Sequence, residues 1–216
     1  EAIGEDTSCN SVDIDSNDAL QSVEGLAGVR GDLPGSLWIW NNSKLVSFHG
    51  LEGIKSIGKD VDGNSILIGG NGVLKSVEGL AGVSGDLLGS LRIESNGKLV
   101  SLHGLEGIES IGQGVDGSSI LLEGNVVLKS MEGLAGMSGN LRGSLIIQNN
   151  GKLVSLHGLE GIKSIGKGIR GWSIYIQGNA VLQSVEGLAG VRGSLPGGLA
   201  IANNSKLLSL YGLVGI

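Results

Sequence analysis

The chain has 216 residues, of which 41 are glycine, and aromatic residues make up only 3% of it. A core without large rings predicts thin aliphatic layers joined at many tight corners. The formal net charge of −6 is opposite to the basic patch of a nucleic-acid-binding protein, and no apolar stretch reaches the roughly 20 residues of a membrane span. Cys9 is the only cysteine, so an internal disulfide is excluded.

One sequence frame, N-x-x-L-x-S-h-x-G-L-x-G-h with h an apolar residue, recurs along the chain. Its asparagines are Asn17, Asn42, Asn71, Asn96, Asn125, Asn150, Asn179 and Asn204. The steps between successive asparagines alternate between 25 and 29 in residue number, so the repeating unit consists of one shorter and one longer coil. Such a repeat predicts a solenoid, in which each coil packs on its neighbours. We expect one solenoid domain over residues 1–216, with units 1–54, 55–108, 109–162 and 163–216.

A short strand is predicted before seven of the asparagines, at residues 37–39, 66–68, 91–93, 120–122, 145–147, 174–176 and 199–201. The first and third residues of each segment are apolar and the middle residue varies, which is the alternation of a strand with one buried face. Glycines on both sides of the frame's second leucine, such as Gly50 and Gly53, permit tight corners. No segment carries a sustained helical period. The sequence therefore predicts an all-β fold, a parallel β-solenoid of about eight coils.

Stacking of identical coils places the repeated polar residues above one another. The asparagine amides are expected to bond turn backbones and one another. Two serine columns are expected to act similarly: Ser36, Ser65, Ser90, Ser119, Ser144 and Ser173 in one, and Ser47, Ser76, Ser101 and their equivalents in the other. Because these residues recur in coil after coil, we interpret them as scaffold.

The pattern GSLxIxxNxxLxShxGLxGI, present from Gly35 to Ile54 and again from Gly89 to Ile108, resembles the receptor L-domain repeat of the leucine-rich-repeat group. That repeat occurs in insulin- and EGF-receptor ectodomains and in fungal GPI-anchored cell-wall proteins. The resemblance covers nearly the whole chain and implies a right-handed parallel β-helix in an extracellular or cell-surface setting. This chain lacks the receptors' cysteines and has more regular, glycine-rich units, which favours a cell-wall or matrix role.

The outward positions of the predicted strands vary against this fixed frame. The middle positions are Trp38, Leu67, Arg92, Leu121, Ile146, Tyr175 and Ala200, and the next outward position begins with Trp40. At about 4.8 Å per coil, they predict an exposed, largely apolar stripe roughly 30 Å long, and patches of that extent mark contact surfaces. The candidate binding face is Trp38, Trp40, Leu67, Arg92, Leu121, Ile146 and Tyr175. Coverage by a neighbouring molecule and tolerated drift are the alternative interpretations.

A second outward column alternates histidine and glutamate: His49, Glu78, His103, Glu132, His157 and Glu186, with Glu24 before them and Tyr211 after them. Adjacent members would lie about 5 Å apart, within reach of an ion pair when the histidine is protonated. A pH-sensitive or metal-binding ladder is one interpretation. We favour a solvated column that keeps like charges two coils apart, because no three-ligand cluster forms.

The sequence also bears on metal binding, glycosylation and catalysis. The segment 60–64 is spaced like part of a calcium loop, but its later equivalents do not repeat the ligands, so neither a metal nor a cofactor is expected. Asn41 and Asn203 begin N-x-S sequons at the same phase of the unit and are candidate glycosylation sites in a secreted eukaryotic protein. Catalytic motifs such as a nucleophile elbow, a P-loop or HExxH are missing from the sequence, so we expect no enzyme.

These observations lead to a non-enzymatic extracellular or cell-surface repeat protein that presents its sheet face for adhesion or assembly. Its partners would be further copies or other surface components, with no nucleic acid and no membrane span. The polar first unit is expected to act as a cap, and the sequence stops in mid-coil at Ile216. Such a stop is expected of part of a longer array, or of an end on which another molecule stacks into a fibre.

Two other functions remain open from the sequence. Ice binding needs a flat, regular, usually threonine-rich face, and Thr7 is the only threonine. Binding of a carbohydrate or protein ligand would use the variable sheet, with Trp38, Trp40, Trp172 and Tyr175 as the aromatic contacts.

Overall fold

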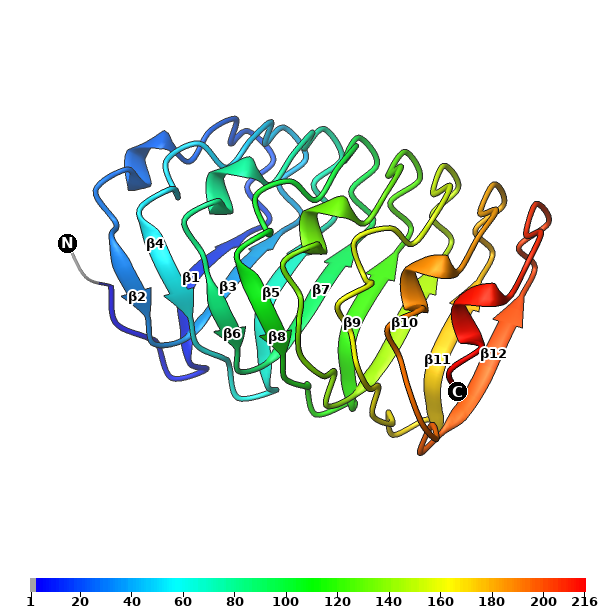
Figure 1. Ribbon diagram of the computed structural model, residues 1–216. Coiled ribbons are helices and arrows are strands. Elements are labelled where there is room, and N and C mark those ends of the chain that lie inside the picture. The colour runs from blue at the N-terminus through cyan, green and yellow to red at the C-terminus, as the bar shows by residue number, and fades with distance from the viewer. Residues whose placement is uncertain (1–2) are drawn as a thin grey trace.

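The computed structural model describes residues 3–216 and shows an all-β solenoid of about eight turns (Figure 1). Eight strands form one parallel sheet: β1 (Asn10–Asp15), β3 (Ser36–Trp40), β5 (Asn64–Gly69), β7 (Ser90–Glu94), β9 (Ser118–Glu123), β10 (Ser144–Gln148), β11 (Trp172–Gln177) and β12 (Gly198–Ala202). The predicted fold class is thereby confirmed, and β1 adds a strand to the seven that the sequence predicts. The right-handed winding stays a prediction.

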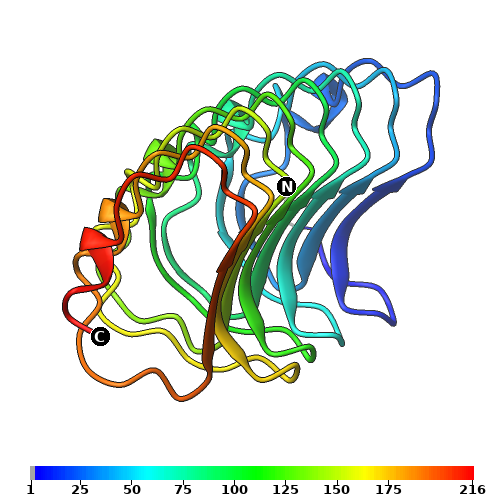
Figure 2. The same cartoon turned by 90° about the vertical axis from the view of Figure 1, so that its right-hand side faces the viewer.

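Two smaller sheets and five short helical turns complete the coils. β2 (Gly31–Leu33) pairs with β4 (Ile54–Ile57), and β6 (Gly85–Leu87) pairs with β8 (Ile108–Ile111), all in parallel. The 3₁₀ turns are η1 (Glu24–Leu26), η2 (Glu78–Leu80), η3 (Glu132–Leu134), η4 (Glu186–Leu188) and η5 (Tyr211–Leu213). Figure 2 shows the large sheet as one curved side of the coil, with these turns away from it. No helix within residues 3–216 is long and apolar enough to cross a membrane.

The core is a continuous stack of aliphatic side chains. The inward residues of β3, Leu37 and Ile39, are fully buried, as are their equivalents in the next strands. Leu45 and Leu51, the two leucines of the frame, are also fully buried. Phe48 is the only aromatic residue in this core. The thin, ring-poor layers that the composition predicts are therefore present.

The asparagine column is a hydrogen-bonded ladder inside the corner after each strand. Asn42 donates its backbone N–H to the Asn71 side chain, in the next coil, at 3.0 Å, and Asn71 donates in the same way to Asn96 at 3.2 Å. The side-chain amide of Asn71 also donates to the carbonyl of Ile39 at 2.9 Å. Each asparagine thus satisfies backbone groups of two neighbouring coils where water is excluded. The predicted scaffold role of the asparagines is confirmed.

The six serines of the first predicted column are buried, but the strand register does not align them, because Ser90 pairs with Asn64 and Ser144 pairs with Ser118. Ser65 accepts the backbone N–H of Gly89 at 2.8 Å, and Ser119 accepts that of Gly143 at 2.7 Å. The hydroxyl of Ser90 donates to the Asn64 side chain at 2.7 Å. All six serines are buried, so they form no exposed outward face, although Ser144 borders a groove on the sheet.

Several glycines lie where coils touch backbone to backbone. A Cβ at Gly79 would lie 2.0 Å from the carbonyl oxygen of Phe48, in the coil before it. Gly50 has a φ of +110°, and a Cβ there would lie 2.5 Å from the carbonyl oxygen of Val23. No other residue type fits these corners without moving the neighbouring coil, which explains the glycine content.

A candidate binding groove on the sheet

The predicted binding face lies on the outer side of the large sheet. Strand pairing aligns its middle residues in one row: Trp38, Leu67, Arg92, Leu121, Ile146, Tyr175 and Ala200. Trp40 pairs with Gly69 in the next outward row, and its ring occupies the space that a side chain on Gly69 would need. The alternation of the sequence therefore placed all seven candidate residues on the correct side of the sheet.

The row is less exposed than the sequence predicts. Leu67 is 5% exposed and Leu121 is 7% exposed, while Trp38, Arg92 and Ile146 are half-buried. Leu67 pairs with Trp38 on one side and Arg92 on the other, and Leu121 pairs with Arg92 and Ile146. The prediction of a freely exposed apolar stripe is therefore wrong, because the larger side chains on neighbouring strands cover the two leucines.

A row of loops forms a wall along the edge where the strands begin. The loops are residues 60–63 before β5, 114–117 before β9 and 168–171 before β11. Val115 donates its backbone N–H to the carbonyl of Asp62 at 2.7 Å, and Ile169 donates to that of Asp116 at 3.1 Å. These bonds tie each loop to the loop one unit before it, so the wall is continuous.

A groove runs between this wall and the sheet face. One section, of about 270 Å³, is lined by Arg92, Glu94, Asp116, Leu121, Glu123, Ser144, Ile146, Gln148, Gly168, Arg170, Trp172 and Tyr175. The adjoining section, of about 410 Å³, is lined by Trp38, Trp40, Asp62, Asn64, Leu67, Arg92, Glu94, Val115 and Asp116. Both sections share Arg92, Glu94 and Asp116, so they adjoin where the ion pair of Arg92 with Asp116 joins the sheet to the wall.

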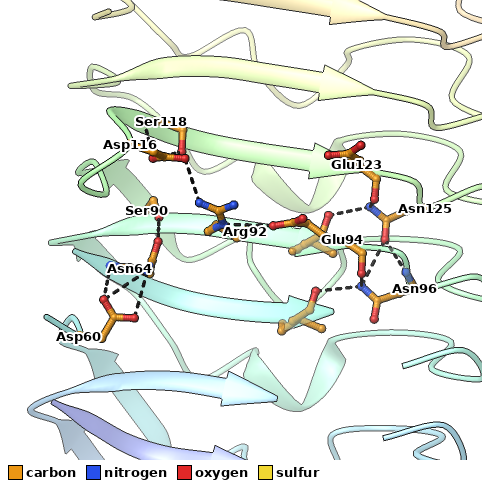
Figure 3. A network of polar contacts seen from close by, with 12 residues as sticks. Asp60, Asn64, Ser90, Arg92, Glu94, Asn96, Asp116, Ser118, Glu123 and Asn125 are labelled. Carbon is orange, nitrogen blue, oxygen red and sulfur yellow. Dashed lines mark hydrogen bonds and ion pairs between the residues drawn. The ribbon is translucent and has the colours of Figure 1, made fainter. Parts of the chain in front are cut away.

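Arg92 is held at the junction of the two sections (Figure 3). Its Nε donates to Glu94 Oε1 at 3.1 Å and its Nη1 donates to Asp116 Oδ2 at 2.9 Å. Asp116 also accepts the backbone N–H of Ser118 at 2.9 Å and its hydroxyl at 2.7 Å. Burial raises the pKa of Asp116, but the bonds from Ser118 and the charge of Arg92 outweigh it and lower that pKa. The groove therefore carries a fixed cation between two acidic side chains.

Aromatic rings lie in both sections. Trp172 and Tyr175 have ring centroids 6.0 Å apart and planes inclined by 49°. Trp38 and Trp40 repeat this arrangement at 6.0 Å and 51°. The hydroxyl of Tyr175 donates to Gln177, whereas Nε1 of Trp38 is buried without a hydrogen-bond partner. Flat apolar surfaces beside fixed polar groups suit a ligand that has both kinds of surface.

Sequence reasoning missed the wall of this groove. No sequence motif marks Asp116, Arg170, Glu94 or Gln148 as a groove residue. A signal was available, because the longer coil of each unit carries its extra residues in this loop, once in every unit.

The calcium-loop fragment has a structural use. Asp60 is buried, and its carboxylate accepts the backbone N–H of Asn64 at 2.8 Å and the Asn64 amide at 3.1 Å. The loop is closed by this side chain, as Figure 3 shows. Within residues 3–216, no three histidine, cysteine, aspartate or glutamate side chains come together as a possible metal site.

The histidines pair within their own coil. Nδ1 of His49 lies 2.8 Å from Glu52, and the equivalent distances are 2.7 Å for His103 with Glu106 and 2.8 Å for His157 with Glu160. Direct pairs with the glutamates of adjacent coils, which the ladder interpretation needs, are therefore not formed by these histidines. The carboxylate three residues ahead is closer, because the backbone N–H of Gly50 and its equivalents also hold it.

The pair of His49 with Glu52 shifts the pKa of both partners. The hydrogen bond to Glu52 raises the pKa of His49, and the charges of Glu52, Glu24 and Glu78 add to it. The same bond lowers the pKa of Glu52. The neighbouring glutamate column thus acts on the histidine through its charge and not by contact.

The remaining candidates lie at the surface. Asn41 and Asn203 are exposed, each with a positive φ at the corner after a strand, so both sequons are accessible. Cys9 is a half-buried free thiol with a φ of 61°, at the place that Gly63 takes in the next unit.

No family model, no curated protein and no solved structure matches this chain.

Proposed function

We propose that this solenoid is a non-enzymatic adhesion module of the receptor L-domain type, located outside the cell or at its surface. Its ligand is an extended carbohydrate that lies in the sheet groove. Oligosaccharides present both apolar ring faces and rows of hydroxyls. The groove offers aromatic rings for the former and Arg92, Glu94, Gln148 and Glu123 for the latter.

One observation carries this proposal: the groove is lined by the positions at which the units differ. Inward leucines and isoleucines, the buried asparagines and the first serine column hardly change from coil to coil. Many groove positions differ between units, as Trp38, Arg92 and Ile146 do, although Leu67 and Leu121 are the same residue at equivalent positions. The rings of β3 and β11 are not repeated elsewhere on the sheet. Residues that are free to vary and are gathered in one groove support recognition of a specific ligand.

Ice binding is less well supported. The first serine column is buried and bonded to backbone, and the sheet face is a groove with charged residues and not a flat, uniform surface. The second serine column is only half-exposed.

The test is a glycan array followed by calorimetry with the best-bound oligosaccharide. Trp172→Ala together with Tyr175→Ala should weaken binding about tenfold or more, since each ring contributes roughly 0.5–1.5 kcal/mol beyond its buried area. Tyr211→Ala removes an exposed ring that lies outside the groove, and this matched control should bind normally. An array without any bound glycan, or equal loss in the control, would reject the carbohydrate ligand.

A further inference from the structure

A second surface follows the asparagine corner of each coil, along the upper edge of Figure 1. There the buried leucine of the frame is flanked by two outward positions, residues 44 and 46 in one coil and 73 and 75 in the next. Six coils carry one lysine at these positions: Lys44, Lys75, Lys98, Lys129, Lys152 and Lys206. We call these six residues the lysine face. The other position holds a valine in the first five of these coils, so lysine and valine exchange places from coil to coil.

Backbone bonds fix the spacing of the lysine face. Lys75 donates its N–H to the carbonyl of Val46 at 3.2 Å, Val100 donates to Lys75 at 3.1 Å, and Lys129 donates to Val100 at 3.2 Å. One coil therefore follows another at the strand spacing of about 4.8 Å. The five consecutive coils from Lys44 to Lys152 place their amines in a row roughly 20 Å long.

The amines on this face are free. All six lysines are exposed, and every ion pair found within residues 3–216 involves a histidine or an arginine. This row holds six of the ten lysines in a chain whose net charge is −6. A few residues further along, the exposed glutamates Glu24, Glu78, Glu132 and Glu186 begin the 3₁₀ turns of every second coil, and histidines take the same position in the coils between them. The positive surface is consequently long and narrow.

We propose that the lysine face binds a linear acidic polysaccharide that runs along the solenoid axis. A chain of carboxylates or sulfates in that direction meets a new amine at every coil, and the intervening valines contact the apolar faces of its rings. Val46, Val100 and Val154 are 41%, 40% and 43% exposed, which leaves their methyl groups available.

Other polyanions fit this surface less well. A nucleic-acid duplex needs a broad basic surface, whereas here the lysines form a single row. A single strand is bound through stacking of its bases on aromatic side chains, and the lysine and valine positions hold none. The proposal does not depend on the sheet groove, because none of the six lysines lines it.

The experiment measures binding of fluorescent polygalacturonate oligomers of increasing length by anisotropy, at low and at physiological salt. Affinity should rise with length until the oligomer spans the five coils, and it should fall with salt. Lys75→Gln/Lys98→Gln/Lys129→Gln should weaken binding about tenfold or more, since three amine contacts are lost. A neutral, methyl-esterified oligomer should not bind.

The control removes the same charge elsewhere, in Lys55→Gln/Lys59→Gln/Lys163→Gln, and should retain affinity within about twofold. Equal weakening of both triple variants would show a net-charge effect and overturn the proposal, as would an absence of binding by the unmodified protein. Tighter binding of a single-stranded oligonucleotide or of anionic phosphatidylserine vesicles, lost in the first triple variant, would assign the surface to that partner instead. Trp172→Ala with Tyr175→Ala should leave this binding unchanged, which separates it from the groove.

Discussion

Removal of one rung from the asparagine ladder should destabilise the protein strongly. Asn96 is fully buried, and its side-chain amide donates to the carbonyls of Ile68 at 3.0 Å and Glu94 at 3.1 Å. Its side-chain oxygen accepts the backbone N–H of Asn71 at 3.2 Å. Asn96→Ala removes these three bonds; the carbonyl of Glu94 keeps the N–H of Gly70 at 3.0 Å, but the N–H of Asn71 and the carbonyl of Ile68 lose this partner. Each buried group left unpaired costs about 1–3 kcal/mol. Allowing for some relaxation, we expect the free energy of unfolding to fall by about 3–5 kcal/mol.

The first asparagine of the ladder provides a matched control. Asn17 is exposed, and its amide donates to a single carbonyl, that of Asp15, at 2.9 Å. Asn17→Ala should therefore cost about 1 kcal/mol or less. The assay is urea unfolding followed by far-ultraviolet circular dichroism and by tryptophan fluorescence, whose coincidence tests two-state behaviour. If both substitutions cost the same small amount, the ladder contributes little and our account of the scaffold is refuted.

Two further predictions concern the corners and the surface pairs. Gly79→Ala places a Cβ against the carbonyl of Phe48 and should lower the free energy of unfolding by about 3 kcal/mol. Gly72 has open space around it, so Gly72→Ala should change that free energy by less than about 0.5 kcal/mol. Similar values for both substitutions, measured by urea unfolding, would contradict the contact. The pair of His49 with Glu52 should stabilise the folded protein fully between pH 4.5 and 6.5. The pKa of His49 is raised, so its contribution is lost as pH rises above 6.5. The pKa of Glu52 is lowered, so its contribution is lost as pH falls below 4.5. Melting temperatures of His49→Gln and the unmodified protein should therefore differ most in that window and converge at pH 9; a difference independent of pH would contradict the pair.

The scaffold was predictable because it repeats. A residue that recurs at every coil, such as Leu45 or Asn42, can serve only what all coils share, namely the core and the corner. Alternation within a three-residue segment was sufficient to place Leu37 and Ile39 inside and Trp38 outside. The sequence therefore predicted the fold class and the sides of the strands.

The groove was not predictable in the same way, because its depth depends on the relative size of side chains on adjacent strands. Leu67 looks exposed in a list of outward residues, and becomes buried only when Trp38 and Arg92 lie on each side of it. The partner of His49 was missed for a related reason. Stacking of the coils predicts only the neighbours of His49 in adjacent coils, whereas the carboxylate of Glu52 reaches its ring within the same coil.

The alternation of coil lengths connects the two surfaces that we assign. Bonding between coils engages the asparagines and the inward serines, so recognition is restricted to outward positions. The longer coil of each unit has its additional residues in a loop, which walls the sheet groove on one side. On the lysine face, the two kinds of coil carry lysine and valine in opposite order at the two outward positions. Each coil therefore supplies one amine, and lysines in the same column are two coils apart. A repeat of two unequal coils can therefore carry two distinct surfaces on one scaffold, whereas a repeat of a single coil would make every column uniform.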